Sequence, residues 1–182
     1  MDFESVFNIL LKNFKQHNIE FALIGGFAMH AAGFSRSTKD IDILVLKNDL
    51  SKIKEIMSSV GYDILHESED VCNFAGKLKE LGKVDFLLGY RRYTKNMLKR
   101  AQEYGILDNT FSVKVIGPED VIGLKVQSSS NEPSRYHHDM SDIEFLIRTR
   151  RDTLDWELIR EYFKLFDRER ELDQLIEKIN NA

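Results

Sequence analysis

Two aspartates separated by one isoleucine could perform chemistry in the first part of the chain. Asp40 and Asp42 flank Ile41 at the start of an apolar run that continues to Leu46. On a β-strand alternate side chains share a face, so both carboxylates would project from one side. Two adjacent carboxylates repel each other unless a cation lies between them. Hard oxygen ligands of this kind favour Mg²⁺ or Mn²⁺, and Mg²⁺ usually completes its shell with water and substrate phosphate.

A phosphate-binding turn is predicted shortly before this pair. Gly25 and Gly26 follow the apolar run 20–24, which we interpret as a buried strand, and they precede a short helical segment that closes at Gly33. A glycine turn between a strand and a helix exposes backbone N–H groups, which bind phosphate at a helix N-terminus. A phosphate cradle beside a pair of metal-binding carboxylates makes a phosphoryl-transfer site.

A third carboxylate is expected on a neighbouring strand. Asp85 fits, because the apolar residues around it in 83–87 predict a core strand with the acid on its open face. In a two-metal site one ion stabilises the leaving pyrophosphate and the other activates the attacking hydroxyl. We predict that Asp40 and Asp42 bridge the ions, and that Asp85 is a ligand of the acceptor-side ion and the candidate general base.

These motifs resemble the nucleotidyltransferase superfamily of the DNA polymerase β type. That superfamily has a hydrophobic-Gly-Gly/Ser element, then Asp-x-Asp/Glu, then a later single Asp. The run 24–42, with its Gly-Gly-Phe-Ala and Arg-Ser-Thr-Lys-Asp-Ile-Asp segments, is most similar to the small enzymes of the AbiEii toxin-like group. The segment 117–125 resembles that group's strand-then-helix, and 135–142 resembles its closing Arg-x-x-x-Asp-x-x-Asp stretch. The resemblance covers about residues 20–147.

The resemblance implies transfer of an NMP from an NTP to a hydroxyl or other acceptor, with release of pyrophosphate and with Mg²⁺ or Mn²⁺ as the cofactor. Gly25 and Gly26 would then cradle phosphate. Arg36, Thr38 and Lys125 would orient the triphosphate, since guanidinium and hydroxyl groups position phosphate oxygens.

The acceptor and the partners remain open at this point. Acceptors in the superfamily include tRNA 3′ ends, protein side chains and small antibiotics, so the resemblance implies an RNA, protein or small-molecule acceptor without choosing among them. A toxin role and an antitoxin-type partner protein rest on the resemblance alone. The alternative is a catalytically silent nucleotide-binding or regulatory module of the same fold. Three like charges kept on one face argue against it.

A second group of titratable residues has a structural interpretation. Asp139 and Asp142 are spaced i, i+3 on a predicted helix, and Arg135 lies four residues before Asp139, which predicts an internal salt-bridge set. His137 and His138 invite a zinc or HD-type phosphohydrolase interpretation. Adjacent histidines on a helix diverge by about 100°, however, and no second His-Asp pair occurs in the chain.

Two basic clusters are predicted to be solvated faces, with an RNA path as the alternative. Tyr90 and Tyr93 lie beside the first cluster and could stack on a base. The clusters are Arg91-Arg92 with Lys95, Lys99 and Arg100, and the run 148–151.

Composition places the chain among ordinary globular proteins. It has 182 residues, 42% hydrophobic and 31% charged, and a net charge of -4, which argues against a surface devoted to nucleic acid or membrane. Cys72, the only cysteine, is expected to be a buried small hydrophobe, and the lack of disulfides fits a cytoplasmic location. The longest run without a charged residue, 21–35, is too short to span a bilayer.

The elements that must position the site follow from periodicity. We expect an α/β (α+β) nucleotidyltransferase fold, with a mixed central sheet flanked by helices over 1–116 and a helical C-terminal part over 117–182 packed on it as one compact domain. Helices are predicted at 3–14 and 50–60, and the helical pattern of the last part begins at Gly117-Pro118. Strands are predicted at 20–24, 41–46, 62–65, 71–75, 83–88 and 113–116.

Overall fold

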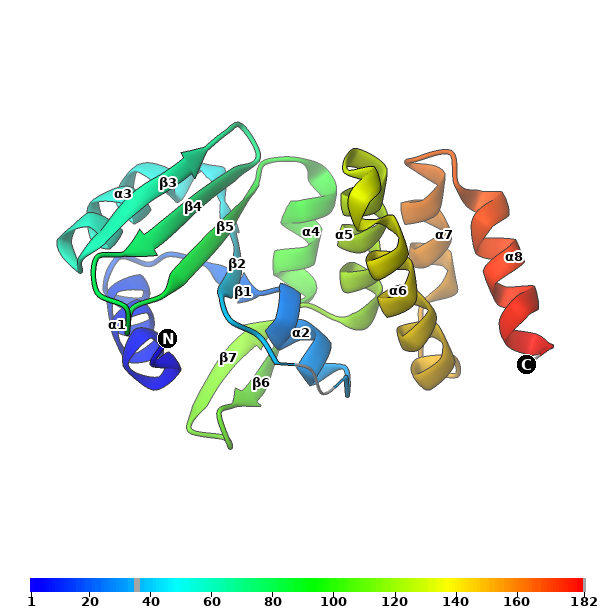
Figure 1. The fold of residues 1–182 in the computed structure, drawn as a ribbon, viewed down its shortest axis with the longest axis horizontal. Helices are drawn as coiled ribbons and strands as arrows, with labels where there is room; N and C mark the ends of the chain where they lie inside the picture. The colour runs from blue at the N-terminus through cyan, green and yellow to red at the C-terminus, as the bar shows by residue number, and fades with distance from the viewer. Residues whose placement is uncertain (35–36, 182) are drawn as a thin grey trace. The chain divides into compact units, whose positions relative to one another are not determined.

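The computed structural model describes residues 1–34 and 37–181. The chain divides into two compact units, Met1–Ile116 and Gly117–Ala182. Among the described residues, the strands all belong to the first unit, and the second unit is helical (Figure 1).

A mixed seven-stranded sheet forms the first unit, in the order β3-β4-β5-β2-β1-β7-β6. The pairs β2–β5 and β1–β7 are parallel, and the other neighbours are antiparallel. The predicted mixed α/β class is therefore confirmed. The strands are β1 (Phe21–Leu23), β2 (Ile41–Leu46), β3 (Tyr62–Glu67), β4 (Val71–Gly76), β5 (Lys83–Gly89), β6 (Gln102–Ile106) and β7 (Phe111–Val115).

One face of this sheet is covered by α1 (Phe3–Gln16), with α3 (Leu50–Ser59) beside β3. In Figure 1 α3 lies behind β3 and β4, and α1 lies below these strands. Asp2 caps α1 by accepting a hydrogen bond from the Ser5 amide at 3.1 Å. Phe14 of α1 meets Phe86 of β5, with ring centroids 6.2 Å apart. Because side chains alternate along a strand, Asp85 must point to the opposite face of the sheet.

Two further helices complete the first unit, α2 (Gly25–Ala31) and α4 (Arg92–Arg100). The sequence predicted α2 from residue 27, whereas the helix begins at Gly25 itself. It did not predict α4 or the edge strand β6. Both elements were missed because most of their side chains are exposed, so their sequences show no regular spacing of apolar residues. α4 buries only Met97 and Leu98, and β6 buries only Ile106.

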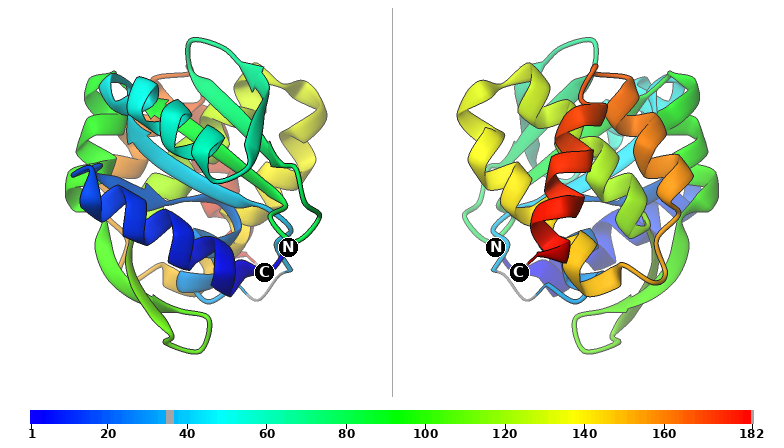
Figure 2. Two further views of the ribbon diagram at one scale, coloured as in Figure 1. Left: turned by 90° about the vertical axis from the view of Figure 1, so that its left-hand side faces the viewer. Right: turned by 90° about the vertical axis from the view of Figure 1, so that its right-hand side faces the viewer.

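The second unit contains α5 (Pro118–Asn131), α6 (Tyr136–Arg150), α7 (Trp156–Lys164) and α8 (Glu169–Asn180), seen in yellow-green to red in Figure 2. The aromatic ring of Tyr162 lies against Gly123, where a Cβ would approach it to 2.7 Å. The Tyr162 hydroxyl donates a hydrogen bond to the buried Asp120 carboxylate at 2.6 Å. A glycine on α5 thus makes room for a polar contact in the centre of this helical unit.

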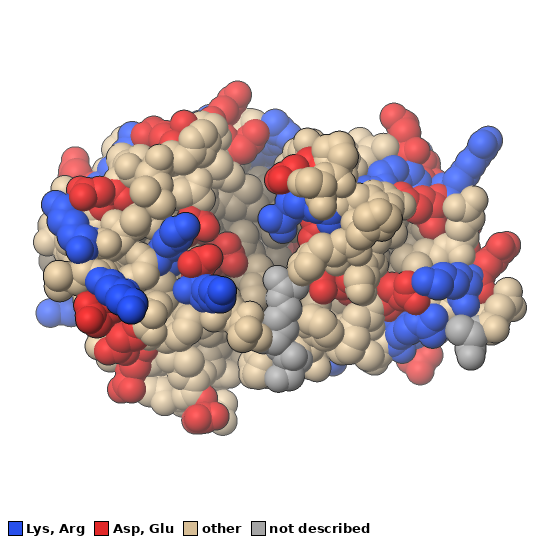
Figure 3. Space-filling view, viewed as in Figure 1, with Lys and Arg blue, Asp and Glu red and all other residues tan. Residues whose placement is uncertain are grey.

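Charge is interspersed over the visible surface. Figure 3 shows Lys and Arg side chains alternating with Asp and Glu over this face, with no area of a single sign. None of the helices in the described part of the chain is both long enough and apolar enough to cross a bilayer.

Candidate active site

The three predicted carboxylates come together on the open face of the sheet. Asp42 of β2 and Asp85 of β5 are direct Cα partners in the parallel pairing of these strands. Asp40 precedes β2 at a bend, and it lies near enough to Asp85 for its negative charge to act on that carboxylate. All three side chains are half-buried, and their neighbours Ile41 and Val84 are fully buried. The apolar neighbours anchor the strands and leave the acids at the surface.

Gly25 lies directly against this acidic group. Its φ is +56°, a region that residues with a Cβ rarely adopt, and a Cβ built there would overlap the carboxylate of Asp42. The amide of the preceding residue, Ile24, donates to the Asp42 carbonyl at 3.0 Å. Only glycine fits at this position, so the backbone turn stays close to the carboxylate.

Gly26 has a different neighbour, Thr38. A Cβ on Gly26 would come within 2.7 Å of both Cβ and Oγ1 of Thr38. The Thr38 hydroxyl donates to the carbonyl of Asp40 at 2.9 Å and so fixes the segment that leads into β2. Its predicted contact with the triphosphate remains a prediction. Arg36, predicted for the same role, lies outside the described residues.

The environment of Asp85 perturbs its protonation equilibrium. Burial raises the pKa of Asp85, and the negative charge of Asp40 raises it further. A hydrogen bond from Asn73 and the positive charge of Lys83 oppose this rise without cancelling it. A raised pKa is what a carboxylate needs to exchange protons near neutral pH.

Asn73 is a residue of this site that the sequence did not indicate. It lies on β4, where it is the Cα partner of Asp85, and its side-chain Nδ2 donates to Asp85 Oδ1 at 2.7 Å. The strand at 71–75 was predicted, but nothing in the sequence sets its register against β5.

The donor chemistry at β2 and β5 fits a divalent cation, since Asp42 and Asp85 are paired carboxylates and the Asp40 carboxylate lies nearby. Among the described residues, one group of three potential metal ligands has its ligand atoms within 4.8 Å of one another: His138, Asp139 and Asp142. The oxygens of Asp40, Asp42 and Asp85 are farther apart than this.

A lysine neutralises the two carboxylates of the His138 group. Lys125 Nζ lies 2.5 Å from Asp142 Oδ2 and 3.1 Å from Asp139 Oδ1, with both acids almost fully buried. Arg135 Nε adds a contact of 3.3 Å to Asp139, which confirms the predicted pairing. The ammonium group therefore occupies the place that a cation would take. The predicted contact of Lys125 with the triphosphate remains a prediction.

The pKa of Asp139 is lowered by this arrangement. Burial alone would raise it, but the attraction of Lys125 and hydrogen bonds from Ser128, Lys125 and Arg135 outweigh the cost of burial. The carboxylate is held ionised in the interior of the second unit.

The ring of Tyr90 is not free to stack on an RNA base, as the RNA alternative requires. Its hydroxyl donates to Asp70 at 2.9 Å, and Lys47 Nζ lies 4.5 Å from the ring centroid. The guanidinium of Arg91 lies 5.1 Å from the same centroid. The ring is thus engaged by cations of its own chain, and the geometry gives the RNA alternative no support at this residue.

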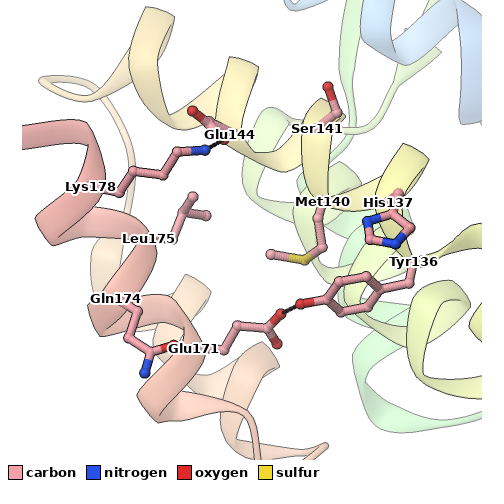
Figure 4. A pocket seen from close by; sticks show the side chains of 9 residues that line it. All are labelled: Tyr136, His137, Met140, Ser141, Glu144, Glu171, Gln174, Leu175 and Lys178. Carbon is pink, nitrogen blue, oxygen red and sulfur yellow. Dashed lines mark hydrogen bonds and ion pairs between the residues drawn. The ribbon is translucent and has the colours of Figure 1, made fainter. Parts of the chain in front are cut away.

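A groove of about 350 Å³ separates α6 and α8 in the second unit (Figure 4). The Tyr136 hydroxyl bonds to Glu171 at one end, and Lys178 Nζ lies 2.7 Å from Glu144 at the other. Each of these polar groups has a partner across the groove. These interactions connect α6 to α8, so we do not interpret the groove as a substrate-binding site.

A family model described as "Nucleotidyl transferase AbiEii toxin, Type IV TA system" matches residues 9–181. The chain belongs to this family. The AbiEii-family assignment confirms the predicted resemblance and makes the protein a nucleotidyltransferase. No curated protein matches the chain.

Solved structures with the same fold include enzymes that modify antibiotics. The solution structure of the antibiotic-resistance factor ANT(2'')-Ia matches with a TM-score of 0.66 at 13% identity, over 100% of both chains. The lincomycin-bound lincosamide antibiotic adenylyltransferase LnuA matches with a TM-score of 0.55 at 17% identity, over 79% of this chain and 97% of that one. An antigenic nucleotidyltransferase-like protein from Paracoccidioides brasiliensis matches with a TM-score of 0.55 at 16% identity, over 97% and 92%. At these identities the likeness shows that the AbiEii-family chain has the nucleotidyltransferase fold.

Proposed function

We propose that this AbiEii-family protein is a Mg²⁺-dependent nucleotidyltransferase that moves an NMP from an NTP to an acceptor hydroxyl. The observation that carries the proposal is the pairing of Asp42 with Asp85 across β2 and β5. Asp40 lies close enough for its charge to act on Asp85. A glycine turn at Gly25 lies against the same carboxylates. Carboxylates beside a phosphate-sized backbone turn are the parts that a phosphoryl-transfer site needs.

The residues of the site divide the work of the reaction. Asp40 and Asp42 would hold the divalent ion, and Asp85 would be its third ligand. Bound Mg²⁺ or Mn²⁺ supplies positive charge beside the phosphate oxygens. Asp85, whose pKa is raised by burial, accepts the proton of the acceptor hydroxyl. The hydroxyl oxygen then bonds to the α-phosphorus, and the bond to the β-phosphate oxygen breaks to release pyrophosphate.

Backbone and basic groups orient the nucleotide in this proposal. The turn at Gly25 and Gly26 cradles phosphate oxygens with its N–H groups. Arg36, Thr38 and Lys125 add a guanidinium, a hydroxyl and an ammonium group.

We infer a toxin role in the cytoplasm and an antitoxin-type partner from the family's own description as part of a Type IV toxin–antitoxin system. RNA, protein and small molecules all carry suitable hydroxyl groups, and the solved structures of similar fold include an adenylyltransferase bound to lincomycin. The assay must therefore offer all three classes. A catalytically silent nucleotide-binding module is disfavoured, because neighbouring carboxylates on a half-buried face repel each other and gain nothing without a cation.

The proposal is tested by incubating the protein with each α-labelled NTP, Mg²⁺ and a mixture of total tRNA and cell lysate. We expect label in one acceptor class, and a loss of at least about a hundredfold in Asp42→Asn. Asp63→Asn is the matched control, because Asp63 is an exposed aspartate on β3 of the same sheet. Full transfer by folded Asp42→Asn would refute the proposal. NTP binding that is independent of Mg²⁺, with no transfer, would favour the silent module.

A further inference from the structure

A polar row crosses four strands of the sheet at the level of the active site. Asp42 of β2 pairs with Asp85 of β5, and Asp85 pairs with Asn73 of β4. Asn73 in turn pairs with His66 of the edge strand β3. Register partners share a face, so Asp42, Asp85 and Asn73 lie in one row, and His66 continues it at the edge strand just after an irregularity in the β3–β4 register.

Asn73 is the member of this row that bonds to a carboxylate of the site. Its amide Nδ2 donates to Asp85 Oδ1 at 2.7 Å, which is a short N–H···O distance. Both side chains are half-buried, so water competes with this bond less than it would at an exposed position.

The side-chain torsions of Asp85 do not by themselves fix the orientation of its carboxylate. The last torsion of an aspartate side chain is broad, so a carboxylate on a strand rotates unless a partner holds it. The charge of Asp40 acts on Asp85 as a repulsion, which favours rotation away from the other acids. The hydrogen bond from Asn73 to Oδ1 resists this rotation. It leaves Oδ2 of Asp85 available as a metal ligand or proton acceptor.

We propose that Asn73 is the positioning residue for Asp85: its amide fixes one carboxylate oxygen so that the other faces the cation and the acceptor hydroxyl. The inference rests on the proposed function, because it assigns Asn73 a part in the same site. It also explains why an amide stands at this position. An ionised aspartate at this position would repel Asp85 instead of donating to it.

The test compares Asn73→Leu, which removes the donor at similar size, with Asn73→Gln, which keeps an amide. His66→Leu is the matched control, since His66 is exposed in the same row on the next strand. Two quantities are measured for each protein: kcat and KM for the NTP with Mg²⁺, and the binding of Mn²⁺ without nucleotide, followed by its electron paramagnetic resonance signal. The melting temperature of each variant records whether the sheet is intact.

We expect Asn73→Leu to lower kcat about 10- to 100-fold with little change in KM, and to weaken Mn²⁺ binding by a similar factor, as loss of a group that orients a metal ligand does. Asn73→Gln should recover part of both losses, and His66→Leu should match the wild type. Wild-type kcat and Mn²⁺ affinity in Asn73→Leu would overturn the inference. Equal losses in Asn73→Leu and His66→Leu would also overturn it, because they would mean general damage to the sheet.

Asp85→Asn separates this inference from the proposed function. If wild-type protein transfers no label to any acceptor class, the proposed function has failed. If Asp85→Asn transfers normally, the role of Asp85 as ligand and base has failed, and the role of Asn73 fails with it. If Asp85→Asn is inactive while Asn73→Leu is normal, only the role of Asn73 has failed. Mn²⁺ binding decides the question even when the acceptor is unknown, because it requires no turnover.

Discussion

Replacing Lys125 with methionine removes the cation from a buried pair of carboxylates. In the folded protein the Lys125 ammonium lies 3.1 Å from Asp139 and 2.5 Å from Asp142. The two acids are 0% and 6% exposed, and Lys125 is 13% exposed. Methionine matches the length of the lysine stem but leaves both negative charges in the interior.

The expected cost follows from this burial. Breaking a buried ion pair by removing one partner costs about 3–5 kcal/mol. Arg135 remains 3.3 Å from Asp139 and is half exposed, so it still neutralises part of that charge. We therefore expect the lower end of the range, about 3 kcal/mol of unfolding free energy.

Trp156 provides the assay. It is the only tryptophan of the chain and begins α7, so its fluorescence reports the unfolding of the helical unit. With a urea slope of about 1–3 kcal/mol per molar, a loss of 3 kcal/mol lowers the midpoint by roughly 1 M or more. Arg160→Met is the matched control. Its partner Asp173 lies 2.9 Å away, but the two are 52% and 56% exposed, so the cost should stay below about 1 kcal/mol.

A triple variant tests whether the lost stability comes from the uncompensated charges. Changing Asp139 and Asp142 to asparagine together with Lys125→Met removes all three charges, so much of the lost stability should return. The account is wrong if Lys125→Met unfolds within about 1 kcal/mol of the wild type, or if the triple variant is no more stable than the single one.

Three further perturbations are expected to act through contacts described above. Gly25→Ala should lower the free energy of unfolding by about 1–2 kcal/mol, because φ at this residue is +56°. It should also reduce nucleotidyl transfer, because the new Cβ would displace the Asp42 carboxylate. Urea unfolding measures the first effect and label transfer the second, and normal transfer would contradict the expectation. Tyr162→Phe should cost about 1–3 kcal/mol by leaving the buried Asp120 without its 2.6 Å donor; an unchanged unfolding curve would speak against that contact. Asp139 has a lowered pKa, so its stabilisation is complete above the pKa of the unfolded chain and is lost as pH falls through the folded value. Urea unfolding between about pH 5 and 3 should be less pH-dependent in Asp139→Asn, and equal slopes would exclude this source of acid sensitivity.

The strands that carry the acids could be predicted because their composition is decisive. β2 is apolar except for Asp42, and β5 buries Val84, Phe86 and Leu88 around Asp85. The spacing of the glycines and the acids then indicated the reaction class. What the sequence could not provide is register, because pairing across strands depends on contacts between residues far apart in the chain. Asn73 became part of the site only through such a pairing.

The partners of Lys125 show the same limit in helices. The i, i+4 pair of Arg135 and Asp139 was predictable, since it lies within one local segment. The contact of Lys125 with both acids depends on how α5 packs against α6, and no local pattern specifies that packing. The helix α4 was missed because charged side chains outnumber the two residues it buries.

The parallel pairing of β2 and β5 also has a consequence for the order of events during synthesis. Parallel neighbours cannot be joined by a tight turn, and here α3 and the β3–β4 hairpin lie between them in the chain. A nascent chain that has emerged only as far as Gly76 contains Asp40 and Asp42 but no β5. Its carboxylates lack their third member until the ribosome has added the next strand and the long loop has closed. On the proposed mechanism, such a nascent chain would lack the carboxylate of Asp85 and would therefore be inactive.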